Sequence, residues 1–236
     1  MLNITTFLDA NACRLDKTVF YCPERDVSYT SKEILAISSE IARQIQALGV
    51  EKGDRVMLYM NSTPEYLFSY FAVWRLGAVA IPTNRVYTPS ELAYMVENSG
   101  AKVIITDADG VSSAEGLGIS VYVPENIEEF RNAAVLPPAK TDFNDLCQLQ
   151  YTSGTTGNPK MAAHKHTYAL GHFVTAKYWH LCEREGLHLT ISDTGWGKSL
   201  WGKFYGQWLC EGAVFVYDFD RFDENDILPM FAKYGI

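Results

Sequence analysis

The sequence has no C-x-x-C pair of cysteines and no long apolar run. Its five cysteines are scattered at positions 13, 22, 147, 182 and 210 of 236 residues. An odd, dispersed set argues against both a disulfide framework and a cysteine-type zinc site. The most apolar stretch, Tyr66 to Pro82, is interrupted by Arg75 and is short for a membrane span.

An excess of positive charge is also absent, and so is the start of a signal peptide. Twenty basic against 28 acidic side chains give a formal net charge of −8, which argues against coating nucleic acid or anionic membrane. Residues 1–22 lack the basic start and apolar segment of a signal peptide. We therefore expect a cytoplasmic protein without a membrane span, whose partners are small molecules and not nucleic acid.

Helical and extended patterns alternate along the chain. Thr30 and Glu33 form a capping box before apolar residues at helical spacing, and Gly49 ends that helix. Further helices are expected at 63–77, 88–98, 167–179 and 224–234, with a Trp-rich helix after residue 196, and strands at 55–60, 78–81, 102–106, 119–123, 146–151, 187–191 and 213–217. This alternation predicts an α/β fold of parallel βαβ units, whose ligands bind beyond the carboxyl ends of the strands.

One loop after a predicted strand carries the residues of an anion site. Tyr151–Lys160 reads YTSGTTGNPK, with two glycines, four Ser or Thr hydroxyls and a terminal lysine. Glycines let backbone N–H groups turn toward a ligand, and hydroxyls and lysine add donors for phosphate. From Leu146 to Cys182 there is no Asp, Glu or Arg, but there are three lysines. A surface loop without a ligand is the alternative interpretation.

Two other phosphate motifs fail. Gly197-Lys198-Ser199 resembles the end of a P-loop, but Ser192 stands where the first glycine is required. A dinucleotide pattern starts at Gly195 and Gly197 but has Leu200 in its last position. A dehydrogenase or kinase of another α/β family is therefore not favoured.

The complete ten-residue loop resembles the phosphate-binding loop of the adenylate-forming (AMP-binding) superfamily. Segments elsewhere are similar too, and they are nearest to the acetyl- and medium-chain acyl-CoA synthetases: Gly77–Asn84, Thr88–Leu92, Ser99–Ile105, Ser192–Trp196, Trp201 and Gly206–Trp208. The resemblance implies that a carboxylic acid and ATP form an acyl-adenylate and pyrophosphate, and that coenzyme A then takes the acyl group. It also implies Mg²⁺ with ATP, and phosphate contacts from Thr152, Ser153, Gly154, Thr155, Thr156, Gly157 and Lys160.

The resemblance covers only the front part of such enzymes. The glutamate that holds magnesium in the family and the catalytic lysine of its C-terminal lid are not found, so the catalytic residues stay unassigned. We expect an N-terminal part that is inactive alone, with about 1–50 and 188–236 in one sheet layer and about 51–187 in the other. The alternative is a non-catalytic nucleotide-binding or interaction module from a truncated gene.

Other conspicuous residues have less specific interpretations. By resemblance, Trp196, Gly197 and Lys198 are candidates for lining an acyl or coenzyme A channel. The histidines at 164, 166, 172 and 180 have only Cys182 nearby and no acidic residue, so we predict structural or channel roles and no metal site. A stripe formed by Trp201, Tyr205 and Trp208 predicts core packing.

Overall fold

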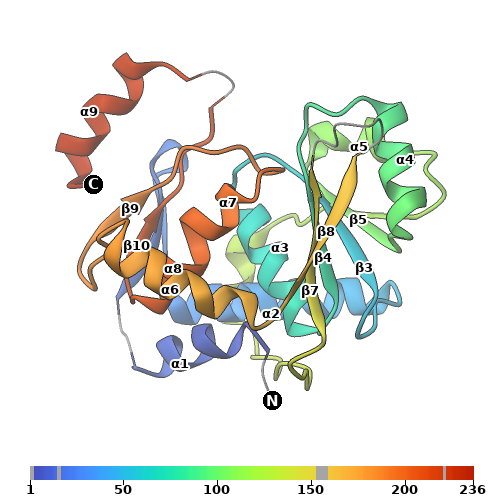
Figure 1. Cartoon of the computed structure of the whole chain (residues 1–236), viewed down its shortest axis with the longest axis horizontal. Coiled ribbons are helices and arrows are strands. Elements are labelled where there is room, and N and C mark those ends of the chain that lie inside the picture. The colour runs from blue at the N-terminus through green and yellow to red at the C-terminus, as the bar shows by residue number, and fades with distance from the viewer. Residues whose placement is uncertain (1–2, 15–16, 153–158, 220–221) are drawn as a thin grey trace.

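The protein contains two β-sheets with helices between and around them (Figure 1). This computed structural model describes residues 3–14, 17–152, 159–219 and 222–236. The first sheet has the order β2-β1-β10-β9, formed by β1 (Thr18–Cys22), β2 (Val27–Thr30), β9 (Leu187–Leu189) and β10 (Ala213–Phe215). Its strands come from both ends of the chain. The division into two layers at the residue boundaries given above stays a prediction.

The second sheet has the order β6-β5-β3-β4-β7-β8. It is formed by β3 (Arg55–Tyr59), β4 (Val79–Thr83), β5 (Val103–Thr106), β6 (Ser120–Tyr122), β7 (Leu146–Thr152) and β8 (Lys160–Lys165). The predicted α/β fold of parallel-sheet layers is confirmed, and two strand pairs within it are antiparallel. β8 runs antiparallel to β7, and β2 antiparallel to β1, because their short connections leave no room for a crossover helix.

Helices begin where the sequence provides caps. The Thr30–Glu33 capping box starts α2 (Ser31–Ala47), and a second box, Thr88 with Glu91, starts α4 (Pro89–Ser99). The remaining helical segments are α1 (Thr6–Arg14), η1 (Pro23–Arg25), α3 (Pro64–Arg75), η2 (Ala108–Gly110), α5 (Val111–Ala114), η3 (Ile127–Phe130), α6 (Tyr168–Tyr178), α7 (Lys198–Leu200), the π-helical η4 (Trp201–Tyr205), α8 (Gly206–Leu209) and α9 (Glu224–Tyr234).

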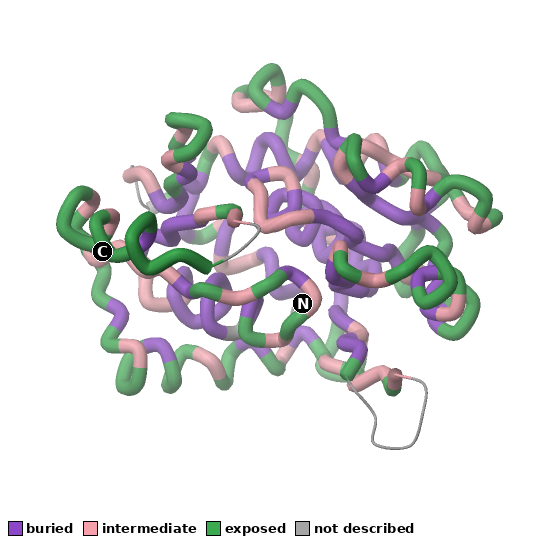
Figure 2. The backbone as a smooth tube through the Cα atoms, turned by 90° about the horizontal axis from the view of Figure 1, so that it is seen from above, coloured by how far each residue is buried: buried purple, intermediate pink, exposed green. Residues whose placement is uncertain are grey.

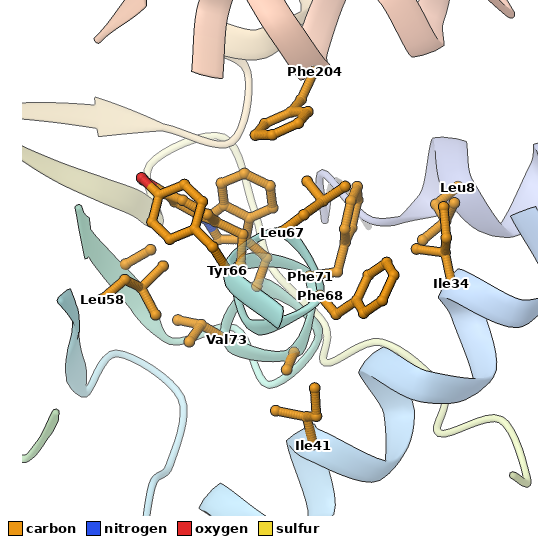
Figure 3. Close-up of a cluster of buried hydrophobic side chains, with 14 of the residues drawn as sticks. Leu8, Ile34, Ile41, Leu58, Tyr66, Leu67, Phe68, Phe71, Val73 and Phe204 are labelled. Atoms are coloured by element: carbon orange, nitrogen blue, oxygen red, sulfur yellow. The ribbon is translucent and has the colours of Figure 1, made fainter. Parts of the chain in front are cut away.

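The main core lies around α3, between the two sheets (Figure 3). Every residue of α3 except Glu65 is buried, as expected for a helix packed on several sides. Phe20 and Val214 reach this core from the first sheet, and Val56 and Leu58 from the second. One continuous apolar cluster therefore joins both sheets.

The last helix, α9, is largely exposed and protrudes from the body of the molecule (Figures 1 and 2). Ile227 is the buried residue of this helix. Among the helices that the structure describes, none has the length and apolar character needed to cross a bilayer.

Candidate functional site

A polar cavity of about 290 Å³ opens where the carboxyl ends of strands from both sheets meet. Its walls follow β3, β4, β9 and β10, and are formed by Asn61, Ser62, Asn84, Arg85, Val86, Ser192, Asp193, Thr194, Tyr217, Asp218 and Phe219. Parallel strands place ligands at this edge. The edge also contains the end of β7, which neighbours β4 and leads into residues 153–158.

The turn at residues 192–196 is held rigidly over the cavity. The Thr194 carbonyl accepts hydrogen bonds from the Tyr66 hydroxyl, at 2.6 Å, and from Ser199 Oγ, at 3.1 Å. Gly195 packs directly on Asn84, since an added Cβ would lie only 2.6 Å from the Asn84 backbone nitrogen. Glycine is thus required here by a close approach of two chain segments.

A chain of buried hydrogen bonds connects this turn with the core. The Tyr205 hydroxyl donates to Gln148 Oε1 at 2.8 Å, and Gln148 Nε2 donates to Gln150 Oε1 at 3.0 Å. Gln150 Nε2 then donates to the Gly195 carbonyl at 2.5 Å. Both glutamines lie on β7. A satisfied buried network of this kind fixes one geometry, here between the exit of β9 and the strand that enters the predicted phosphate loop.

A buried lysine lies behind the cavity wall. Lys203 is only 2% exposed, and its Nζ donates to Ser62 Oγ at 2.8 Å. Burial lowers the pKa of Lys203 to about 8, and Asp218 and Asp193 oppose this effect. A single positive charge thus lies close behind the polar lining, where the low dielectric strengthens its field.

Arg85 supplies a second positive charge at the cavity. Its guanidinium forms an ion pair with Asp107 at 2.9 Å and lies 4.8 Å from the centre of the Tyr59 ring. Its Nε atom is buried without a hydrogen-bond partner among the described residues. Two cations and the acidic Asp193 and Asp218 therefore surround a cavity that suits a polar ligand.

The predicted phosphate loop is only partly described. Ser153, Gly154, Thr155, Thr156 and Gly157 lie outside the described residues. The two ends are placed: Thr152 closes β7 and is paired with Lys160 at the start of β8. Both are exposed, and Thr152 Oγ1 donates to the Lys160 carbonyl at 3.3 Å. Their phosphate contacts stay a prediction.

The candidates for lining an acyl or coenzyme A channel lie at the end of the turn at residues 192–196 and directly after it. Trp196 is 67% exposed, Gly197 is half-buried, and Lys198 is exposed at the start of α7. The Gln150–Gly195 hydrogen bond brings this segment beside β7, two residues before Thr152. The structure thus places the channel candidates near the strand that leads to the phosphate loop. Their contact with a substrate stays a prediction.

The histidines have separate environments. His166 is buried, and its Nδ1 accepts a hydrogen bond from the Ile4 backbone N–H at 3.1 Å. Burial lowers the pKa of His166 to about 4, so its ring is neutral. His164 and His172 each pack against the Tyr168 ring, with ring centres at 4.3 and 4.9 Å. The structural or channel roles of these histidines stay a prediction.

Sequence reasoning missed several residues of the cavity region. Gln148 and Gln150 lie in a strand that neighbours β4 and β8, and their polar side chains in an apolar pattern were the available signal. Lys203, within the Trp-rich segment, gave a similar signal. Tyr205 and Trp208 are buried as predicted. The side chain of Trp201 lies outside what the structure describes.

Comparison with known proteins agrees with this architecture. Residues 7–236 match the family model described as AMP-binding enzyme. The chain is 31% identical over 229 residues to the mitochondrial acyl-coenzyme A synthetase ACSM3 of Homo sapiens, an alignment covering 89% of this chain and 39% of that protein. It therefore spans about two fifths of the length of this curated relative.

Solved structures share the fold. The inhibitor-bound N-terminal domain of FACL13 from Mycobacterium tuberculosis has a TM-score of 0.88 and 25% identity, covering 100% of this chain and 62% of that one. ATP-bound MatB from Rhodopseudomonas palustris has a TM-score of 0.83 and 23% identity, covering 98% and 48%. Because the family model matches nearly the whole length of the chain, the chain belongs to the AMP-binding enzyme family.

Proposed function

We propose that these 236 residues form the ATP-binding part of an AMP-forming acyl-CoA synthetase. The observation that carries the proposal is the YTSGTTGNPK segment between β7 and β8 in a chain of the AMP-binding family. The segment starts at the sheet edge where the polar cavity opens. The alternative, a non-catalytic nucleotide-binding module, would use the same loop.

The proposed reaction has two transfers. A carboxylate oxygen of a small acid attacks the α-phosphorus of ATP, forming acyl-AMP and releasing pyrophosphate. The thiol of coenzyme A then attacks the acyl carbon, forming the thioester and releasing AMP. Two anions must approach each other in the first step, so donors preorganised around the phosphates lower its barrier. Backbone N–H groups at Gly154 and Gly157, the hydroxyls of Ser153, Thr155 and Thr156, and Lys160 would supply them.

Mg²⁺ does not fit a resident site among the described side chains. Within the described ranges, the group of His, Cys, Asp or Glu residues that could share an ion is His180, Cys182 and His188. Nitrogen and sulfur donors do not suit a cation that prefers oxygen. We therefore expect Mg²⁺ to arrive with the phosphates of ATP.

Calorimetric titration with ATP tests the loop. Each hydrogen bond to a charged phosphate oxygen contributes about 1.5–3 kcal/mol, so replacing Thr155 and Thr156 together by Ala should weaken ATP binding at least ~100-fold. Lys160→Ala should weaken it less, because a lysine on a long stem adapts to several positions. Thr175→Ala, on the exposed surface of α6, is the control and should bind like the unchanged chain.

Separate outcomes test the proposal that the loop binds ATP and the proposal that the protein is an acyl-CoA synthetase. Absence of saturable ATP binding would overturn the loop, and a larger loss in Lys160→Ala would contradict the assigned contacts. Acid-dependent exchange of pyrophosphate into ATP is expected of a protein that adds the remaining family motifs, and not of these residues alone. If that longer protein binds ATP without any exchange, the non-catalytic module is correct.

The proposed partners are ATP, coenzyme A and a small carboxylic acid. A cytoplasmic location stays a prediction, and the scattered cysteines, all of which are free, support it. The similar human protein ACSM3 is named as mitochondrial. Fractionation of cells that express the tagged protein would decide between the two compartments.

A further inference from the structure

Two residues after α6 and one residue of β9 form a cluster of metal-ligating side chains outside the lining of the polar cavity. The donor atoms of His180, Cys182 and His188 all lie within 4.8 Å of one another. Cys182 is buried, and the two histidines are half-buried. The sequence grouped His180 with the histidines at 164, 166 and 172, named Cys182 as their one nearby ligand and predicted no metal site. His188 supplies a third donor from β9, because the fold returns that strand beside the end of α6.

The backbone turns the first two donors toward the same place. Leu181, between them, adopts a left-handed conformation with φ of 53° and exposes 73% of its surface. A non-glycine residue rarely adopts this conformation. The Cys182 N–H donates to the Ala176 carbonyl at 2.9 Å, so the turn is fastened to the last part of α6. Both side chains that flank Leu181 reach the cluster while Leu181 faces solvent.

The His188 ring has the orientation of a metal ligand. Its Nε2 lies 2.9 Å from Thr190 Oγ1, which donates its own proton to the Gly202 carbonyl, and 3.0 Å from that carbonyl, so the tautomer with the proton on Nε2 satisfies both contacts. Nδ1 therefore presents its lone pair toward Cys182 Sγ, 3.7 Å away. Histidines that bind metals commonly donate their second N–H to a backbone carbonyl in this way. A tetrahedral zinc ion, with Zn–S of about 2.3 Å and Zn–N of about 2.0 Å, would separate these two atoms by about 3.5 Å.

A buried amide side chain lies beside the cluster. Gln207 is fully buried, and its Nε2 lies 3.1 Å from His180 Nδ1. Its Oε1 atom has no hydrogen-bond partner among the described residues. A cavity of about 220 Å³, lined by the three donors and by Gly186 and Gly212, leaves room for a water molecule as the fourth ligand.

We propose that His180, Cys182 and His188 form a site for a borderline-soft divalent cation, with Zn²⁺ as the matching ion, that fastens the end of α6 to β9. Two nitrogens and one sulfur are the donors of zinc sites, and the mixed set excludes Mg²⁺ and Ca²⁺. Cys182 would bind as thiolate, and its proton would pass to solvent. Because the donor atoms are as much as 4.8 Å apart, a small rotation of the half-buried His180 must close the site.

Cobalt titration of the metal-free protein tests the proposal, since Co²⁺ reports a bound thiolate by a sulfur-to-metal charge-transfer absorption. One equivalent of Co²⁺ should produce this band, and Zn²⁺ should abolish it. Cys182→Ser should lose the band, and His188→Ala should weaken Co²⁺ binding at least ~10-fold. Cys210→Ser, a cysteine near Cys182 but outside the cluster, is the matched control and should retain the band.

A second measurement uses the unaltered protein, so it does not depend on the folding of a variant. Zn²⁺ should slow alkylation of Cys182 and leave alkylation of the exposed Cys13 unchanged, as read by mass spectrometry of the peptides. A cobalt complex without the charge-transfer band, a band that survives Cys182→Ser, or equal alkylation with and without Zn²⁺ would each overturn the site. None of these results depends on ATP binding.

Discussion

Lys203 is a buried charged side chain near the polar cavity, and its burial lowers the stability of the folded protein. Its side chain is fully enclosed and has one hydrogen bond, to Ser62. The unfolded chain holds this proton up to about pH 10.5, but burial lowers the pKa of the folded group to about 8. Between these values the unfolded state binds more protons, so the free energy of unfolding should rise with pH.

Lys203→Met removes this charge and keeps most of the side-chain volume. At pH 7 the variant should be more stable than the unchanged protein by about 2 kcal/mol, the cost of the lowered pKa less one hydrogen bond. This advantage should shrink as pH rises from 8 toward 10.5, because the unchanged protein then loses its buried charge. Urea unfolding of both proteins at pH 7 and pH 10 measures the difference.

The control is Lys198→Met, which alters an exposed lysine at the start of α7. Its stability difference should stay within about 0.5 kcal/mol, as for other exposed substitutions. Equal behaviour of the two variants would show that burial does not control the proton of Lys203.

At the scale of helices and strands, the capping box of α2 is the clearest local signal that determines where a helix begins. Thr30 Oγ1 accepts the Glu33 N–H at 3.2 Å, and Glu33 Oε2 accepts the Thr30 N–H at 2.8 Å. Thr30→Ala should therefore lower the free energy of unfolding by about 1 kcal/mol, because the helix loses a partner for an N-terminal N–H. Thr30→Ser retains the hydroxyl and should be nearly neutral. Chemical denaturation of the pair checks this, and equal losses would assign the effect to the methyl group.

The elements that the sequence predicted well are those with local signals. Capping residues and helical spacing located α2, α3 and α4, and apolar runs located β3 and β5. The hairpin of β7 and β8 was missed because β8 (Lys160–Lys165) is an edge strand of mixed composition, KMAAHK, with no buried residue and no apolar run. Pairing in such a strand depends on its neighbour and not on its own composition.

The candidate site was less predictable, for a similar reason. The phosphate loop is a continuous segment and could be recognised as such. Asn84, Gln150 and Gly195 are far apart in sequence and meet only when the exits of β4, β7 and β9 converge. His188 joins His180 and Cys182 in the same way. A single sequence carries no local signal for contacts that the fold creates.

For the whole molecule, the question is whether two sheets behave as one folding unit. Phe71 on α3 is fully buried. Its ring lies 6.1 Å from Phe7 of α1, 5.7 Å from Trp74 of α3 and 5.1 Å from Trp208 of α8, measured between ring centres. The cluster that contains it also includes strands of both sheets. Neither sheet can lose this packing alone, so unfolding should be a single transition.

Phe71→Ala tests this cooperativity. Removing a buried ring from a close-packed core should cost about 3–5 kcal/mol. Because the core is shared, the urea midpoints followed by tryptophan fluorescence and by far-UV circular dichroism should fall together. Leu228→Ala, on the exposed face of α9, should leave both midpoints nearly unchanged. If Phe71→Ala moved only one midpoint, or split the transition into two steps, the sheets would be separate folding units, and the cavity between them would be an interface that opens without global unfolding.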